Sequence, residues 1–276
     1  MATPLGDFLR ARRDATPPAT VGLPTTGRRR APGLRRSELA ALAGISVEYL
    51  TRIEQGRDRN PSVQVVTAIA EALRLDPSER EHLRNVTKVS AGQCLAGEPG
   101  RTQVRPSVRA ILDQLEPGPA VVTNRFGDLL AYTSGYERLA VAVGLLDDPE
   151  PNLTRYVFTD ERARSTFPDW DRVADQQALS IWTGIAGDRA AAFVEELGAA
   201  GGEEFTRRLS GVAVPRHGSL RWHHPDVGEL RLDREVLELP ADDAQQLVVL
   251  LPADEVTAAA LDRLHRAASG SLRAVR

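Results

Sequence analysis

Apolar residues recur at helical spacing through the first 90 residues. Leu5, Phe8 and Leu9 predict a first helix of about ten residues. The stretch Thr16–Gly33 is rich in Pro and Gly and has no period, so we expect a loop there. Further helical patterns cover Arg35–Ala43, Ser46–Gln55 and Ser62–Leu73, and a fifth begins near Pro77. Five short helices in one stretch predict an all-α domain over residues 1–90.

The pattern changes beyond residues 91–104, which are small, polar and interrupted by Gly and Pro, as expected of a linker. Helical patterns cover Pro106–Leu115, a middle region at about 134–210, and Asp254–Ala268. The runs predicted as strands are Ala120–Thr123, Asp128–Thr133, Ser219–His223, Glu229–Leu232, Val236–Leu239 and Gln246–Leu251, with turns at Asn124–Gly127, Pro225–Gly228 and Asp233–Glu235. Residues 105–276 are therefore predicted to form an α+β domain with an antiparallel sheet, which makes the chain multidomain.

The segment Leu34–Gly56 carries the clearest motif in the chain. Leu39 and Leu42 lie one helical turn apart, Gly44 can adopt the left-handed conformation at a helix end, and Ser46 can cap the next helix. Two short helices joined by such a turn describe a helix-turn-helix, whose second helix enters the major groove of DNA. The alternative is an αα-hairpin inside a purely structural bundle.

Charge is divided unevenly along the chain. The overall net charge is only −3, but the first 90 residues hold 15 Lys+Arg and 10 Asp+Glu, whereas the remainder holds 20 and 28. A basic region of this kind is typical of a DNA-binding module. Arg35 and Arg36 begin a predicted helix, where cations are unfavourable, so we expect an anion such as a DNA phosphate beside them, unless they are simply solvated.

Other classes of protein are disfavoured by the composition. The single Cys94 excludes an internal disulfide, no apolar run is long enough to cross a membrane, and the first residues carry charges throughout, so we expect a cytoplasmic protein without membrane contact. His223 and His224 are adjacent and would point to opposite faces of a strand, so they cannot share a metal. We find no nucleophile elbow, P-loop or dinucleotide fingerprint, and we expect no catalytic activity, no metal and no cofactor.

Several motifs resemble one family over nearly the whole chain. Leu34–Gly56 resembles the Xre-type helix-turn-helix regulators, and both the insertion that ends in GRRRAPGLRRSELA and the later QGRDRNPS resemble their MmyB-like branch. Pro151–Phe158, Phe167–Trp170 and His224–Pro240 resemble the C-terminal ligand-binding domain of that branch, which is PAS-like. Tyr132 and Thr133 stand where the branch usually has Trp-Asn.

The resemblance implies double-stranded DNA as a partner and assigns contacts to it. The residues expected to face the bases are at the start of the second helix: Val47, Glu48, Thr51 and Arg52, and Ser46 before them is a further expected DNA contact. Arg52 suits a guanine and Val47 a thymine methyl group, whereas Glu48 either accepts from cytosine or stays in solvent. The residues expected on the DNA backbone are Arg35, Arg36, Arg57, Arg59 and Asn60. The resemblance also implies that Arg12 pairs with Glu54 inside the domain.

The cluster Arg28, Arg29 and Arg30 has two interpretations. It is either an arm that reaches a minor groove or flanking phosphates, or a solvated run of charge.

The resemblance further implies that the second domain binds a small hydrophobic ligand such as a fatty acid. The candidate ligand contacts are Tyr132, Arg155, Tyr156, Phe158, Trp170 and Trp182. The aromatic candidates could instead be core, and Arg155 or Arg162 could meet a ligand carboxylate or form surface ion pairs. We expect a homodimer in which the ligand changes the arrangement of two DNA-binding domains. The alternative is a second domain that serves as a protein-interaction or dimerisation module without a ligand.

Overall fold

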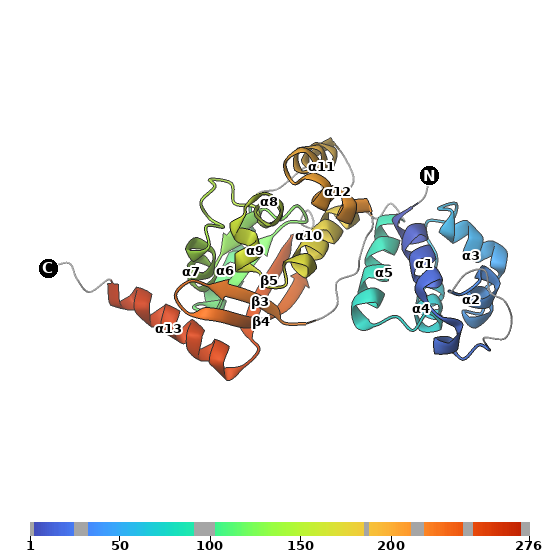
Figure 1. Ribbon diagram of the computed structural model, residues 1–276, viewed down its shortest axis with the longest axis horizontal. Coiled ribbons are helices and arrows are strands. Elements are labelled where there is room, and N and C mark those ends of the chain that lie inside the picture. The colour runs from blue at the N-terminus through green and yellow to red at the C-terminus, as the bar shows by residue number, and fades with distance from the viewer. Residues whose placement is uncertain are drawn as a thin grey trace. The chain divides into compact units, whose positions relative to one another are not determined.

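The computed structural model describes residues 3–24, 33–90, 103–184, 188–210, 218–239 and 245–271. The chain divides into two units, Met1–Cys94 and Leu95–Arg276 (Figure 1). The predicted triplet Arg28, Arg29 and Arg30 lies outside the described residues.

The described part of the N-terminal unit contains five α-helices, so the prediction of an all-α domain is confirmed. The helices are α1 (Pro4–Ala15), α2 (Arg36–Leu42), α3 (Val47–Glu54), α4 (Val63–Ala72) and α5 (Pro77–Ser90), and a short 3-10 helix, η1 (Pro18–Val21), follows α1. The side chains of Thr3, Ser46 and Ser62 accept a hydrogen bond from a backbone N–H in the first turn of α1, α3 and α4. These caps satisfy donors that a helix start otherwise leaves unpaired.

Gly33, the last residue of the predicted loop, and Leu34 after it pack against α1. Leu34 is buried and its backbone N–H donates to the carbonyl of Arg13. A Cβ at Gly33 would lie 2.1 Å from the carbonyl oxygen of Asp14, so only glycine permits this approach.

The second unit is built on a five-stranded antiparallel sheet with the order β2-β1-β5-β4-β3. The strands are β1 (Ala120–Thr123), β2 (Leu129–Tyr132), β3 (Leu220–His224), β4 (Gly228–Glu238) and β5 (Gln246–Pro252). The helices are α6 (Pro106–Leu115), α7 (Ser134–Ala142), α8 (Leu153–Thr159), α9 (Arg162–Thr166), α10 (Trp170–Gly184), α11 (Asp188–Ala200), α12 (Gly202–Ser210) and α13 (Glu255–Ser271). The predicted α+β class with an antiparallel sheet is confirmed.

One predicted turn is wrong. Asp233–Glu235 does not separate two strands, because β4 continues through it. The first half of β4 pairs with β3, and the second half pairs with β5, with Asp233 opposite Leu251 and Glu235 opposite Val249. Three charged residues in a row suggested a turn, but pairing with a distant strand holds them extended, and Asp233 and Glu235 point to solvent.

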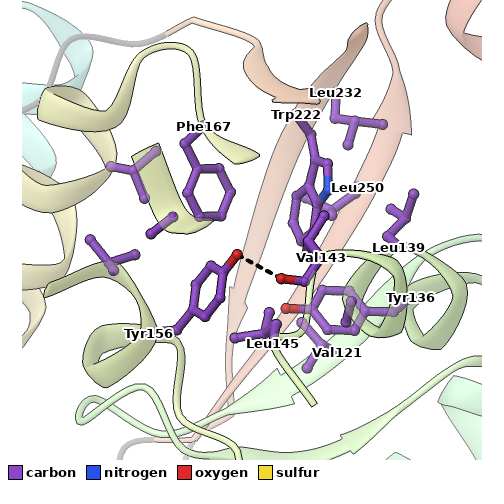
Figure 2. Close-up of a cluster of buried hydrophobic side chains, with 14 of the residues drawn as sticks. Val121, Tyr136, Leu139, Val143, Leu145, Tyr156, Phe167, Trp222, Leu232 and Leu250 are labelled. Atoms are coloured by element: carbon purple, nitrogen blue, oxygen red, sulfur yellow. Dashed lines mark hydrogen bonds between the residues drawn. The ribbon is translucent and has the colours of Figure 1, made fainter. Parts of the chain in front are cut away.

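The main core lies between one face of the sheet and the helices that cover it (Figure 2). Its large side chains include Tyr136, Trp222, Phe167 and Tyr156, and in this order each ring meets the next edge to face. A smaller cluster, on α6 and the opposite face of β1, includes Val108, Leu112 and Val122. Both faces of β1 are therefore covered, and all four of its residues are buried.

Candidate DNA interface and ligand cavity

The turn between α2 and α3 has the geometry that the sequence predicts. Gly44 follows the end of α2 with a φ of 65°, and the N–H of Ile45 donates to the carbonyl of Ala40. The Oγ of Ser46 accepts the N–H of Tyr49 at 3.0 Å. Leu39, Leu50 and Ile53 are fully buried. These buried side chains hold one face of α3 against the domain, and the opposite face of α3 is open to solvent.

The open face of α3 presents the residues predicted to contact bases. Ser46, Val47, Glu48 and Arg52 are exposed, while Thr51 is half-buried and its hydroxyl donates to the carbonyl of Val47 at 2.7 Å. The Arg52 guanidinium lies 5.4 Å from the ring centre of Tyr49. Such a cation–π contact restricts the side chain before any partner arrives.

The segment after α3 adds exposed polar and cationic groups. Arg57, Arg59 and Asn60 are all exposed. Arg59 Nε donates to the carbonyl of Gly56 at 3.3 Å, and the Asn60 N–H donates to Asp58 Oδ1 at 3.3 Å. The turn is therefore ordered by its own hydrogen bonds, with its side chains free to meet a phosphate backbone.

Carboxylates of the domain itself lie beside Arg35 and Arg36. The Arg35 N–H donates to Glu38 Oε2 at 2.7 Å, and Arg36 Nε lies 2.6 Å from Glu54 Oε2. Glu38 caps the backbone at the start of α2 and Glu54 pairs with Arg36, so carboxylates of the domain already lie at this helix start, and its charge alone does not require a phosphate. The Arg36 side chain remains 43% exposed and accessible to a partner.

The expected pairing of Arg12 with Glu54 is wrong by one residue. Arg13 Nε lies 2.7 Å from Glu54 Oε1, whereas Arg12 pairs with Glu79 at 2.7 Å. Leu5, Leu9 and Arg13 follow at spacings of four, so Arg13 continues the buried stripe of α1 and Arg12 is rotated toward α5.

The predicted ligand contacts are spread over the second unit. Tyr132 is 38% exposed, and Arg155 pairs with Glu196 at 2.9 Å. The Tyr156 hydroxyl donates to the Val143 carbonyl at 3.0 Å (Figure 2). Phe158 and Trp170 pack against each other at 6.1 Å between ring centres.

Trp182 and Arg162 are the remaining candidates for contact with a ligand. The side chain of Trp182 lies outside the described residues. Arg162, the other candidate for a ligand carboxylate, forms ion pairs with Asp147 and Asp160.

A cavity of about 60 Å³ lies between the sheet and the helices α8 and α10. Its apolar lining is Val121, Tyr136, Leu153, Phe167, Val173, Leu220, Trp222, Val248 and Leu250, and its polar lining is Thr123, Asn124, Gln176, Gln177, Ser180, Arg234 and Gln246, with Gly127 beside them. None of the five predicted ligand contacts with described side chains is part of this lining.

Arg234 is the one cation among the described residues that line this cavity, and the sequence analysis did not predict its place. It shares one face of β4 with Leu230, Leu232 and Val236, because alternate residues of a strand point the same way. The alternation from Leu230 to Val236 is visible in the sequence, and it would have placed Arg234 inward had Asp233–Glu235 not been interpreted as a turn.

A second cavity, of about 250 Å³, lies between the C-terminal end of β5 and the helices α7 and α13. Its walls are mostly apolar and include Leu115, Val249, Leu251 and Leu261. Arg138 and His265 also line it, with 3.1 Å between Arg138 Nη2 and His265 Nδ1. The predicted ligand contacts with described side chains do not line this cavity either.

Two other features are absent from the described residues: a membrane-spanning helix and a metal site. No described helix is both long enough and apolar enough to cross a membrane. No group of three or more His, Cys, Asp or Glu side chains within the described ranges is placed to hold a metal ion. His223 is exposed and His224 is buried, so the two rings do point to opposite faces of β3.

Comparisons with known proteins match both units. Residues 4–83 match the model of a helix-turn-helix domain, and residues 104–264, more than half of the chain, match the model described as the MmyB-like transcription regulator ligand binding domain. A search of curated proteins found no match. The chain therefore belongs to the MmyB-like transcription regulators and combines a helix-turn-helix DNA-binding domain with a ligand-binding domain.

Proposed function

We propose that this protein is a non-enzymatic, cytoplasmic regulator that binds specific duplex DNA through α3 and responds to a small ligand in its second domain. The observation that carries the proposal is the arrangement of α3, which buries Leu50 and Ile53 completely and presents Val47, Glu48 and Arg52 to solvent. A short helix whose buried face packs against the rest of its domain in this way fits the major groove.

The DNA contacts follow from the chemistry of the exposed face. Arg52 can donate two hydrogen bonds to a guanine, and Val47 can pack against a thymine methyl group. We assign Arg36, Arg57, Arg59 and Asn60 to contacts with the phosphate backbone, and we assign Arg28, Arg29 and Arg30 to an arm that reaches a minor groove or flanking phosphates. The surplus of 15 basic over 10 acidic side chains in the first 90 residues supports an electrostatic share in binding.

For the second domain we propose a small, mainly hydrophobic ligand of the fatty-acid type. The cavity between the sheet and the helices, whose lining combines apolar and polar side chains, supports this. In a homodimer, a ligand that favours one arrangement of the two DNA-binding domains would change the spacing of the half-sites that they can reach.

A second candidate function is supported by exposed apolar side chains around α13. Val141 on α7, Leu251 on β5 and Val256 on α13 are 56%, 47% and 74% exposed, and α13 packs against both α7 and β5. Such a surface suits a dimerisation or protein-docking face without any ligand.

Genome-wide footprinting of the purified full chain on DNA of its own host tests the DNA-binding half of the proposal. We expect protected sites that share a sequence, whose affinity falls steeply with salt concentration. Absence of any salt-sensitive affinity for a duplex would overturn it. Thermal shifts with a panel of fatty acids and metabolites, beside analytical ultracentrifugation of the untreated protein, separate a ligand sensor from a dimerisation module.

A further inference from the structure

The larger cavity, of about 250 Å³, lies beside α13 and differs from the cavity between the sheet and α10. Among the described residues, Leu250 is the only one that lines both cavities. Ala258, Leu261 and His265 line the larger cavity from α13. Because these three residues are spaced by three and four positions, they form one stripe along the helix.

The neighbouring stripe of α13 holds the helix against the domain. Thr257 and Ala260 are buried, and the Thr257 hydroxyl accepts the backbone N–H of Arg231 on β4 at 3.0 Å. Ala260 belongs to the main core, and Leu264 packs against it. One side of α13 is therefore fixed, while the short side chain of Ala258 leaves space between the helix and the end of β5.

The walls of this space are mainly apolar. Leu250 is 3% exposed, and Leu115, Leu261 and Leu264 are half-buried. Apolar walls favour an apolar occupant, because contact with it removes their surface from water. A cavity that accommodates benzene has about 150 Å³, so the larger volume here suits a molecule of about two fused rings.

The charge of Arg138, which lines the cavity from α7, is balanced within the domain. Arg138 Nη2 donates to Ser134 Oγ at 3.0 Å, and that hydroxyl donates to Glu116 Oε2 at 2.6 Å. Nη2 also lies 3.1 Å from His265 Nδ1. A carboxylate therefore lies two hydrogen bonds from the guanidinium, and the cavity does not call for a charged ligand.

Arg138 nevertheless offers donors to a neutral ligand. Both of its contacts use Nη2, and no hydrogen bond joins its Nε or Nη1 to another residue in the described ranges. A guanidinium has five N–H groups, so those on Nε and Nη1 can donate to a carbonyl oxygen.

We propose that this cavity is a second ligand site, which binds a neutral hydrophobic molecule of about two fused rings whose carbonyl oxygen accepts a hydrogen bond from Arg138. Both the site and the ligand class differ from those of the sensing function proposed above, so the second site does not depend on that function. An occupant contacts α13, β5 and α7 together, and it therefore stabilises the packing of α13 on the domain.

Calorimetric titration of the full chain with 2-acetylnaphthalene and with 2-naphthoate tests the ligand class without any variant. The two compounds are similar in shape, but only the second is charged. We expect the ketone to bind about tenfold or more tightly, because burial of the carboxylate among apolar walls is costly. No binding of 2-acetylnaphthalene, or binding of 2-naphthoate that is equal or tighter, would overturn the inference.

Hydrogen exchange of the unchanged protein then locates the bound ketone. We expect 2-acetylnaphthalene to slow the exchange of backbone amides in α13 from Ala258 to His265, and to leave α10 unchanged. Protection of α10 without α13 would place the compound in the smaller cavity and refute the second site.

A matched pair of substitutions on α13 tests the same site. Ala258→Leu fills the cavity, whereas Ala259→Leu makes the same change at an exposed position that does not line it. We expect Ala258→Leu to weaken binding of 2-acetylnaphthalene about tenfold or more and Ala259→Leu to leave it unchanged. Equal affinities of the two variants would contradict the assignment. If the ketone does not bind and Ala258→Leu separates a dimer in analytical ultracentrifugation, a second copy of the chain covers the cavity, and the ligand site is wrong.

Discussion

Arg13 on α1 and Glu54 at the end of α3 form the central ion pair of the DNA-binding domain, with 2.7 Å between Nε and Oε1. Glu54 is completely buried, and its second oxygen lies 2.6 Å from Arg36 Nε on α2. Arg13 Nη1 also donates to the carbonyl of Leu34 at 2.9 Å. One carboxylate therefore ties α1 and α2 to the end of the helix that is proposed to enter DNA.

Replacement of Glu54 by alanine should strongly destabilise the domain. The change leaves the buried Arg13 Nε without its carboxylate, while Nη1 keeps the exposed Asp14 at 2.6 Å, and breaking a buried pair costs about 3–5 kcal/mol. Urea unfolding followed by far-UV circular dichroism measures the loss. The control is Asp7→Ala, which removes an exposed partner of Arg10 at 3.7 Å and should change stability by less than about 1 kcal/mol. Equal effects of the two substitutions would refute the central role of Glu54.

The buried His82 should make the domain sensitive to mild acid. Burial, assisted by the Arg12 cation, lowers the pKa of His82 from 6.5 to about 4. The unfolded chain therefore protonates His82 more readily than the folded domain does. The contribution of neutral His82 to the stability of the folded domain is complete above pH 6.5 and is lost as the pH falls to about 4. When this contribution is lost completely, the free energy of unfolding falls by about 3 kcal/mol.

His82→Leu removes this titration and keeps an apolar group against Phe8. Between pH 7 and pH 4.5, its free energy of unfolding should fall by less than that of the unchanged protein. His223→Gln, at an exposed position, should follow the unchanged protein. Parallel pH profiles for His82→Leu and the unchanged protein would show that another group causes the acid sensitivity.

The structure also shows which features the sequence could predict. The turn between α2 and α3 was predicted correctly, because it depends on local features. The left-handed conformation of Gly44 and the cap that Ser46 provides both depend on residues within about four positions in the sequence. The course of β4 depends on pairing with β5, which local charges at Asp233–Glu235 cannot reveal. Arg234 was missed for the same reason, because the turn expected at Asp233–Glu235 interrupts the alternation that places Arg234 on the core face of β4.

Arg74 offers a stabilising substitution. Three helices of the DNA-binding domain end in the same motif, in which the residue after the C-cap adopts a left-handed conformation. That residue is Gly44 after α2, Gly56 after α3 and Arg74, with a φ of 52°, after α4. A residue with a Cβ costs about 1–2 kcal/mol in this conformation. Glycine removes that cost, but it also makes the unfolded chain more flexible, which offsets part of the gain in stability.

We therefore expect Arg74→Gly to raise the free energy of unfolding by about 0.5–1 kcal/mol. Arg84→Gly, at an exposed position inside α5, is the control and should lower it by about 1 kcal/mol. Both are measured by urea unfolding under the same conditions. A decrease of similar size in both variants would mean that the left-handed conformation at Arg74 is not strained.

Arg52 is the residue on which sequence discrimination should depend most. Its guanidinium is exposed on the open face of α3 and is steadied by the ring of Tyr49. Loss of a bidentate contact to guanine costs about 1–3 kcal/mol in specific binding, whereas non-specific binding depends on phosphates and should change little. Fluorescence anisotropy with a footprinted site and with an unrelated duplex, both at one salt concentration, measures the two affinities for Arg52→Ala. Arg84→Ala, which removes an exposed arginine of α5 in the same domain, should leave both affinities unchanged. If Arg52→Ala weakens binding to the two duplexes equally, Arg52 contacts phosphate and not a base. Val47 and Glu48 would then be the residues of α3 that contact bases.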